Sequence, residues 1–203
     1  MKALAIRVER SGSVSEVREY LASLEDAYVR IYAFDFAVNE LRQRSDETIS
    51  SSFREPSRKR SARFPAIRNP QALLLPGDQL TIHRIEVASP GFWEVLGALN
   101  PLETIRKYIA DRHERTKDRE YRNDLDLQER QLEIEKRRIE VVRERVDLLH
   151  SLGVPEEQIR RAVVQLVSQP LGQLDRIQDS RLISTAELVE IPARSSGDTA
   201  ADA

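Results

Sequence analysis

The sequence predicts an α+β fold: a small β-α-β-β head, a long charged helix of coiled-coil type, and a C-terminal helical hairpin with a final strand. Three patterns predict this class. Apolar and polar residues first alternate, as in a strand, and apolar residues then recur every three or four positions, as in a helix facing a core. Residues 101–152 carry 13 basic and 13 acidic side chains, which indicates a solvent-exposed helix. We expect a head over 1–88, an apolar neck and charged helix over 89–152, a helical element and strand over 153–191, and a disordered tail over 192–203.

The head begins with a strand and a helix. Alternating apolar residues predict the strand over 2–9. Ser13 and Glu16 have the spacing of a capping box, so a helix begins there, and its 3.6-residue pattern runs to about residue 43. Residues 28–38 also fit a period of two, which leaves a strand there as the alternative.

Residues 44–70 lose all periodicity and predict a long basic loop with seven basic and three acidic residues. Basic side chains supply the sequence-independent part of nucleic-acid binding, so an anion or nucleic-acid contact through 54–68 is one hypothesis. A solvated loop is the other, because few aromatic residues are there to stack on bases. The four clustered basic residues are Arg58, Lys59, Arg60 and Arg63.

A hairpin is predicted to complete the head. Turn-forming residues 76–78 separate the apolar segments 73–75 and 80–87. The apolar phase slips after Ile82, which predicts a β-bulge at His83. If the first two strands are parallel, the helical crossover between them should be right-handed.

The neck over 90–109 is the densest apolar stretch of the chain. Helix-start signals predict a short helix over 90–98 and a second helix from residue 101. We expect the neck to pack on the open face of the head's sheet. The alternative is a peripheral membrane contact, or a partner contact, through Phe92 and Trp93.

The charged helix has apolar rows on two sides. A single helix over 101–151 would be about 75 Å long at 1.5 Å per residue, so part of it should project from the head. Two rows about 200° apart call for two neighbours, within the chain or across an oligomer. The interface residues predicted from these rows repeat by seven and are Leu125, Leu132, Ile139 and Val146, with Val142 and Leu149, and on the other side Leu127, Ile134, Val141 and Leu148.

The C-terminal part is predicted as a helical hairpin with a strand. Gly153 ends the charged helix, and Pro155 followed by two acidic residues begins the next one. Pro170 should end that helix. Residues 182–191 then read as a strand that either extends the head's sheet or pairs with a copy of itself.

The composition excludes several kinds of chemistry. There is no cysteine, and the three histidines and seven glycines are too scattered for a zinc site or a phosphate-binding loop. We therefore expect no catalytic, cofactor-binding or metal-binding residue and no cofactor. The longest uncharged run, 162–174, is too short to cross a bilayer, and no secretory signal is evident, so we expect a cytoplasmic protein without integral membrane insertion.

A second pattern links the neck to the C-terminal part. It consists of Ser89, Pro90, Gly91, Phe92 and Trp93, then Asn100, Pro101 and Leu102, and later Pro170, Leu171, Leu174, Ile177 and Asp179. Over roughly residues 80–185 the chain resembles a group of uncharacterised bacterial proteins. In these a small α/β head is followed by a central apolar segment, in some members a membrane span, and then a charged helix. The resemblance implies no activity, ligand or catalytic residue, and this chain differs from the group where charges interrupt its central segment.

These patterns predict a function without catalysis. We expect a protein–protein interaction or oligomerisation module, a scaffold or adaptor, that acts through the long two-faced helix. Its partner would be a second copy of the chain, another protein, or both. The alternatives are nucleic-acid association through the basic loop and membrane association through the neck.

Overall fold

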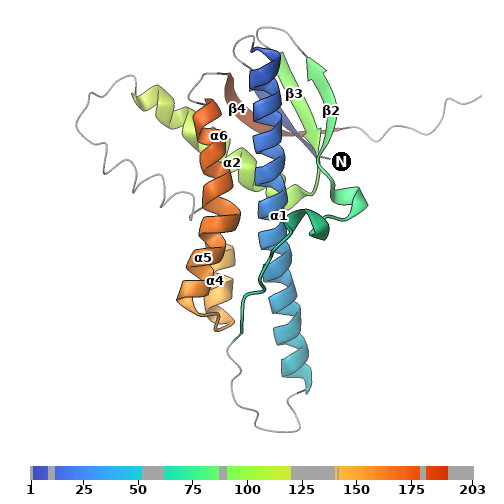
Figure 1. Cartoon of the computed structure of the whole chain (residues 1–203), viewed down its shortest axis with the longest axis vertical. Helices are drawn as coiled ribbons and strands as arrows, with labels where there is room; N and C mark the ends of the chain where they lie inside the picture. Colours follow the sequence, from blue (N-terminus) through green and yellow to red (C-terminus); the bar gives the residue numbers. More distant parts are fainter. Residues whose placement is uncertain are drawn as a thin grey trace, which may run out of the picture.

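Four strands form one sheet in the computed structural model, and the helices lie on one side of it (Figure 1). The structure describes residues 2–8, 12–51, 62–86, 91–119, 140, 142–178 and 182–191. The helices and strands are β1 Lys2–Val8, α1 Val14–Ser51, β2 Thr81–Glu86, β3 Gly91–Leu96, α2 Leu99–Arg119, α4 Arg143–Ser151, α5 Glu156–Val163, α6 Gln169–Gln178 and β4 Ile183–Glu190. Mixed helices and an antiparallel sheet confirm the α+β class.

The sheet has the strand order β2-β3-β1-β4, and every neighbouring pair is antiparallel. β1 and β2 therefore run in the same direction with β3 between them, and β3 and β4 do so with β1 between them. This is the split β-α-β arrangement, used twice. The expected crossover from the first strand to the second is present, but it spans a third strand. The last strand extends the head's sheet beside β1, which was one of its two predicted roles.

β2 forms its hairpin with β3, so the predicted hairpin across residues 76–78 is wrong. Residues 70–73 and 76–78 form short 3₁₀ turns, each with a proline at its start, and leave no strand before β2. The predicted bulge is confirmed, because the pairing of β2 with β3 shifts register between Ile82 and Arg84.

Residues 91–96 are strand β3, and the short helix predicted over 90–98 is therefore wrong. Gly91, Trp93 and Val95 are buried, whereas the residues between them are half-buried. That period of two places alternate side chains on opposite faces of the sheet. Burial of one face outweighed the local helix-start signal.

The capping box is present as predicted. The Ser13 N–H donates to Glu16 Oε2 at 2.7 Å, and the Glu16 N–H donates to Ser13 Oγ at 3.2 Å. The helix then continues to Ser51, so the end expected near residue 43, the loop over 44–51 and the alternative strand over 28–38 are all wrong. Residues 44–51 contain neither glycine nor proline, so no helix-breaking residue ends the helix near residue 43.

The core of the head lies between α1 and the sheet. Tyr20, Tyr28 and Phe34 of α1 are fully buried together with Leu4 and Ile6 of β1. α2 adds further buried apolar residues to the same core, so this part of the neck packs on the face of the sheet that also carries α1, and the expected packing on the open face is wrong. The core residues of β3 and α2 are Trp93, Val95, Leu102, Ile105, Tyr108 and Ile109.

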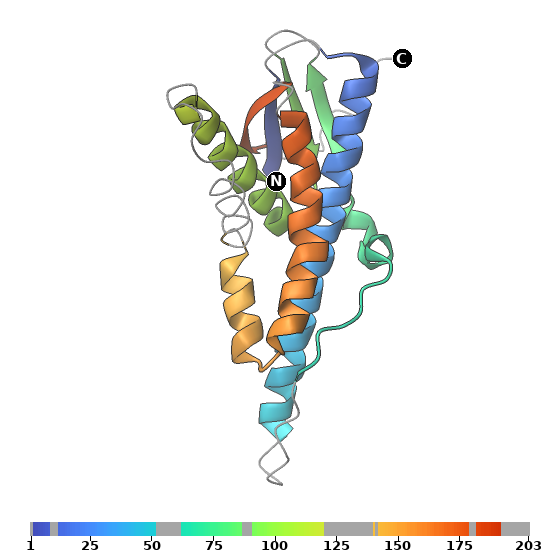
Figure 2. The ribbon, with the colours of Figure 1, turned by 60° about the vertical axis from the view of Figure 1, so that its left-hand side comes forward.

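α6 lies beside α1 and reaches β4 of the sheet, whereas α4 and α5 pack together farther from the sheet (Figure 2). Val142 has φ −114° and is the N-cap of α4, so α2 and α4 are separate helices and the single rod over 101–151 is wrong. Gly153, with φ +75°, ends α4 as expected, and α5 begins after Pro155. The helical hairpin is therefore confirmed, whereas residues 120–139, the centre of the predicted coiled coil, lie outside the described residues.

Pro170 does not end the helix, which was the expectation. The helix continues to Gln178 because a π-helical turn over Val164–Ser168 precedes the proline. A proline in a regular helix lacks an N–H donor and clashes with the carbonyl four residues earlier. The wider turn contains that carbonyl and so accommodates the ring.

The Tyr20 hydroxyl has no hydrogen-bond partner among the described residues, although it is buried and burial raises its pKa. Replacing Tyr20 by phenylalanine is expected to raise the free energy of unfolding by about 1 kcal/mol, because an unsatisfied buried polar group is removed. Urea unfolding measures this change. Tyr28→Phe is the matched control and should destabilise, since the Tyr28 hydroxyl accepts from the Ala98 N–H at 2.6 Å. Equal losses of stability in Tyr20→Phe and Tyr28→Phe would contradict the conclusion that the Tyr20 hydroxyl is unsatisfied.

Candidate interaction surface

The sheet face that points away from α1 and α2 is not covered by any described helix. It holds a shallow depression of about 550 Å³. We call this surface the open sheet face. Its lining side chains come from β1, β3 and β4 and are Ala5, Arg7, Phe92, Thr185, Glu187 and Val189.

Phe92 and Trp93 point to opposite faces, so they do not form the joint membrane contact considered above. Trp93 is 3% exposed, and its ring lies 5.4 Å from that of Tyr20. Phe92 lies on the open sheet face, where the Arg84 guanidinium carbon is 4.8 Å from its ring centroid. That cation–π contact covers one side of the ring.

The outer edge of the sheet at β2 is the most exposed part of the head. All six residues from Thr81 to Glu86 are exposed, including Ile82 at 53% and Ile85 at 41%. β2 pairs with β3 on one side and with no other strand of the described chain. We call this row of residues the β2 edge. An edge strand carries unpaired backbone N–H and C=O groups, which can pair with another strand.

Asp35 of α1 and Arg145 of α4 form an ion pair that is largely removed from solvent. Arg145 Nη2 donates to Asp35 Oδ2 at 3.1 Å, and Arg145 Nε contacts Oδ1. Burial raises the pKa of the Asp35 carboxyl to about 6, and the Arg145 guanidinium opposes that shift without cancelling it. The pair holds two helices together.

The raised pKa of Asp35 makes stability depend on pH. The folded state keeps this proton to about pH 6, whereas an unfolded carboxyl loses it near 3.8, so stability falls as pH rises through that window. Between pH 4 and pH 7 the wild type should lose about 2 to 3 kcal/mol relative to D35N, which cannot titrate there. Urea unfolding of both proteins across this range tests it. A constant difference between them would contradict the raised pKa.

A second buried group joins α2 to α6. The Tyr108 hydroxyl donates to Asp175 Oδ1 at 2.5 Å, and Arg112 Nη1 lies 2.8 Å from the same oxygen. Arg112 Nη2 also donates to the Asp175 carbonyl at 3.2 Å. These hydrogen bonds and this ion pair connect α2 to α6, as the Asp35–Arg145 pair connects α1 to α4.

Two tyrosines of α1 bind the turn before β2. The Tyr28 hydroxyl donates to the Asp78 carbonyl, and the Tyr32 hydroxyl donates to Asp78 Oδ2 at 2.7 Å. Burial raises both pKa values, that of Tyr32 to about 12, so both hydroxyls stay protonated at neutral pH. Gly97 allows the close approach, because a Cβ there would lie 2.7 Å from Tyr28 Oη. These hydroxyls position the turn and are not activated for chemistry.

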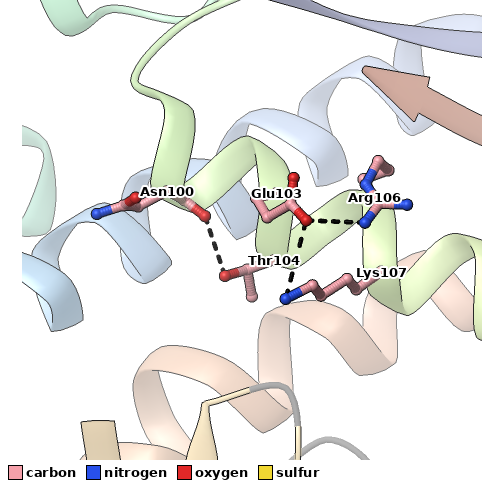
Figure 3. A network of polar contacts seen from close by, with 5 residues as sticks. All are labelled: Asn100, Glu103, Thr104, Arg106 and Lys107. Carbon is pink, nitrogen blue, oxygen red and sulfur yellow. Dashed lines mark hydrogen bonds and ion pairs between the residues drawn. The ribbon is translucent and has the colours of Figure 1, made fainter. Parts of the chain in front are cut away.

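The first turns of α2 carry a local polar network (Figure 3). Arg106 Nη2 donates to Glu103 Oε1 at 2.8 Å, and Lys107 Nζ lies 3.8 Å from that oxygen. The hydrogen bond from Arg106 keeps the pKa of Glu103 below its ordinary value. Thr104, which is buried, donates to the Asn100 carbonyl at 3.0 Å. All of these bonds lie within one helix, so they stabilise it locally.

The structure places four of the predicted interface residues. Val142 and Leu149 are fully buried inside the chain, and Val146 and Leu148 are partly buried against the same core. α1 and α5 cover this part of the two rows from within the chain. The other predicted interface residues, Leu125, Leu127, Leu132, Ile134, Ile139 and Val141, lie outside the described residues.

Of the four predicted basic contacts, Arg63 is described, and Arg58, Lys59 and Arg60 lie outside the described residues. Arg63 lines a cavity of about 260 Å³ with Arg161 and Gln158 of α5. The Phe64 N–H donates to Gln158 Oε1 at 2.9 Å, which fixes the segment against α5. Arg161 is 3.4 Å from Glu157, so an acid already neutralises part of this charge.

No group of three or more metal-binding side chains occurs in the described part of the chain. Among the described helices, none is long and apolar enough to span a membrane.

Sequence reasoning placed β2 and its bulge but missed that the strand is an edge. The signal was present: a bulge together with charged residues at alternate positions is typical of edge strands. Comparison of the chain with protein-family models, with curated proteins and with solved structures finds no match.

Proposed function

We propose that the protein is a non-enzymatic self-association module whose contact surface is the β2 edge. The observation that carries the proposal is that all six residues of β2 are exposed, among them Ile82 and Ile85. Pairing would satisfy the free backbone groups of the strand and remove Ile82 and Ile85 from water. A scaffold or adaptor role follows from such an assembly.

The buried polar groups support this class of function. Asp35, Asp175 and the hydroxyls of Tyr28 and Tyr32 each connect one element of the chain to another. They are used in holding the fold together, and none lines the depression on the open sheet face. The surface that remains offers contacts for another protein chain.

Light scattering over a series of protein concentrations tests the proposal. The expected result is a mass that rises from monomer to dimer, and an I85K variant that remains monomeric. V164K is the matched control, because Val164 is also exposed but lies on the helical part. A wild type that stays monomeric at its highest soluble concentration would refute self-association, and equal loss of dimer in both variants would place the contact elsewhere.

A further inference from the structure

We infer that the second copy pairs its β2 antiparallel to β2 in one register, with Ile85 opposite Ile85. The inference rests on the self-association proposed above and names its geometry. It would join two four-stranded sheets into one continuous sheet of eight strands.

Symmetry limits the registers that two identical strands can adopt. In an antiparallel ladder, opposite residues alternate between hydrogen-bonded and non-hydrogen-bonded pairs. A two-fold axis relates the two copies and exchanges residue pairs across the ladder. Two exchanged pairs must therefore both be hydrogen-bonded or both be non-hydrogen-bonded. The axis therefore lies midway between one residue and the same residue of the other copy. We describe that residue as being on the axis, and it defines the register.

The bulge sets which side chains share a face of β2. Ile82 pairs with Val95 and Ile85 pairs with Trp93, so both isoleucines are on the face that carries the helices. Arg84 pairs with Glu94 and lies on the open sheet face, as Glu86 does. Arg84 Nη2 is 3.3 Å from Glu86 Oε2, in agreement with this placement. A two-fold axis perpendicular to the sheet keeps the helices of both copies on one side.

Charge selects the Ile85-centred register. With Ile85 on the axis, Arg84 of each copy faces Glu86 of the other, which makes two complementary pairs beside an apolar pair. With Arg84 on the axis, two guanidinium groups would face each other. With His83 on the axis, Arg84 would face Ile82. The side chains of Arg84 and Glu86 are 60% and 46% exposed, so both are accessible to a partner.

The same features exclude open-ended association. Charges and a bulge on an edge strand disfavour most strand pairings, which is how exposed edges avoid aggregation. Here they favour the Ile85-centred register, in which Arg84 of each copy faces Glu86 of the other. Because the contact is two-fold symmetric, it closes on itself and ends at a dimer.

Charge exchange tests the register. In a homodimer, R84E places acids opposite acids and E86R places bases opposite bases, so each single variant should dimerise at least about tenfold more weakly than wild type. An equimolar mixture of R84E and E86R restores opposite charges across the axis and should form a mixed dimer. The double variant R84E/E86R should again form homodimers. Light scattering gives the masses, and native mass spectrometry identifies the mixed species.

R143E is the matched control, because Arg143 is an exposed arginine paired with Glu140 on the helical part. It should dimerise as wild type does, and circular dichroism should show that all variants are folded. If the wild type dimerises but the single variants do so equally well, or the mixture restores nothing, the register is overturned and self-association stands. A wild type that is monomeric at every concentration overturns both proposals.

Discussion

Replacing Arg145 by methionine should lower the free energy of unfolding by about 3 kcal/mol at pH 7. The variant leaves the Asp35 carboxylate in a site that is 9% exposed, without the cation that now faces it. Methionine keeps much of the aliphatic length of arginine, so the loss reports mainly the missing charge. The loss should be smaller at pH 5, because a protonated Asp35 needs no cation.

Urea unfolding at both pH values measures this effect. R143M is the matched control, because Arg143 and its partner Glu140 are 68% and 65% exposed. Exposed pairs contribute little, so R143M should change stability by less than about 0.5 kcal/mol. Equal losses in R145M and R143M would show that the Asp35 pair has no special role.

Replacing Asp175 by alanine should destabilise the protein by about 3 kcal/mol or more, because it removes the acceptor shared by Tyr108 and Arg112. D175N should lose less, since its amide oxygen can still accept from the Tyr108 hydroxyl. Thermal unfolding followed by circular dichroism gives the order of the variants.

The control for Asp175 is E157A. Glu157 also meets two arginines, with Arg160 at 2.9 Å and Arg161 at 3.4 Å, but all three side chains are mostly exposed. E157A should leave the thermal stability close to that of the wild type, because exposed ion pairs contribute little. A D175A protein as stable as E157A would mean that α2 and α6 are held by apolar packing alone.

Local signals in the sequence were sufficient to predict those helix ends that depend on nearby residues. The capping box at Ser13 and Glu16, the stop at Gly153 and the start after Pro155 all act within a few residues. The bulge in β2 was visible as a phase slip. These features depend on neighbours along the chain, so they can be predicted from the sequence without knowledge of the fold.

The errors arose where distant contacts decide the structure. Residues 91–96 became a strand because the sheet buries Trp93 and Val95, and no local pattern shows that a sheet is there. Val142 and Leu149 looked like a partner interface because their row repeats by seven, but these two residues are buried within the chain, where α4 packs against α1 and α5. Apolar periodicity tells that a face is covered and not which element covers it.

The candidate surface was the least predictable part. β2 is exposed because it is a terminal strand that is not covered by a described helix, whereas β4, the other terminal strand, packs against α2; tertiary structure determines both facts. The same isoleucines on an inner strand would be core residues. Their role as a contact surface is therefore a property of topology.

The pairing of β1 with β4 also bears on how the chain folds. Residues 2–8 pair with residues 183–190, and the helices α4, α5 and α6 are made between them. During synthesis β1 and β3 exist long before β4 emerges, so β1 is temporarily an outer strand. Contacts between residues so far apart in the chain slow folding, because a long loop must close first. Before β4 forms, the free edges of the sheet are β2 and β1, and pairing of β4 with β1 replaces the edge at β1 by one at β4.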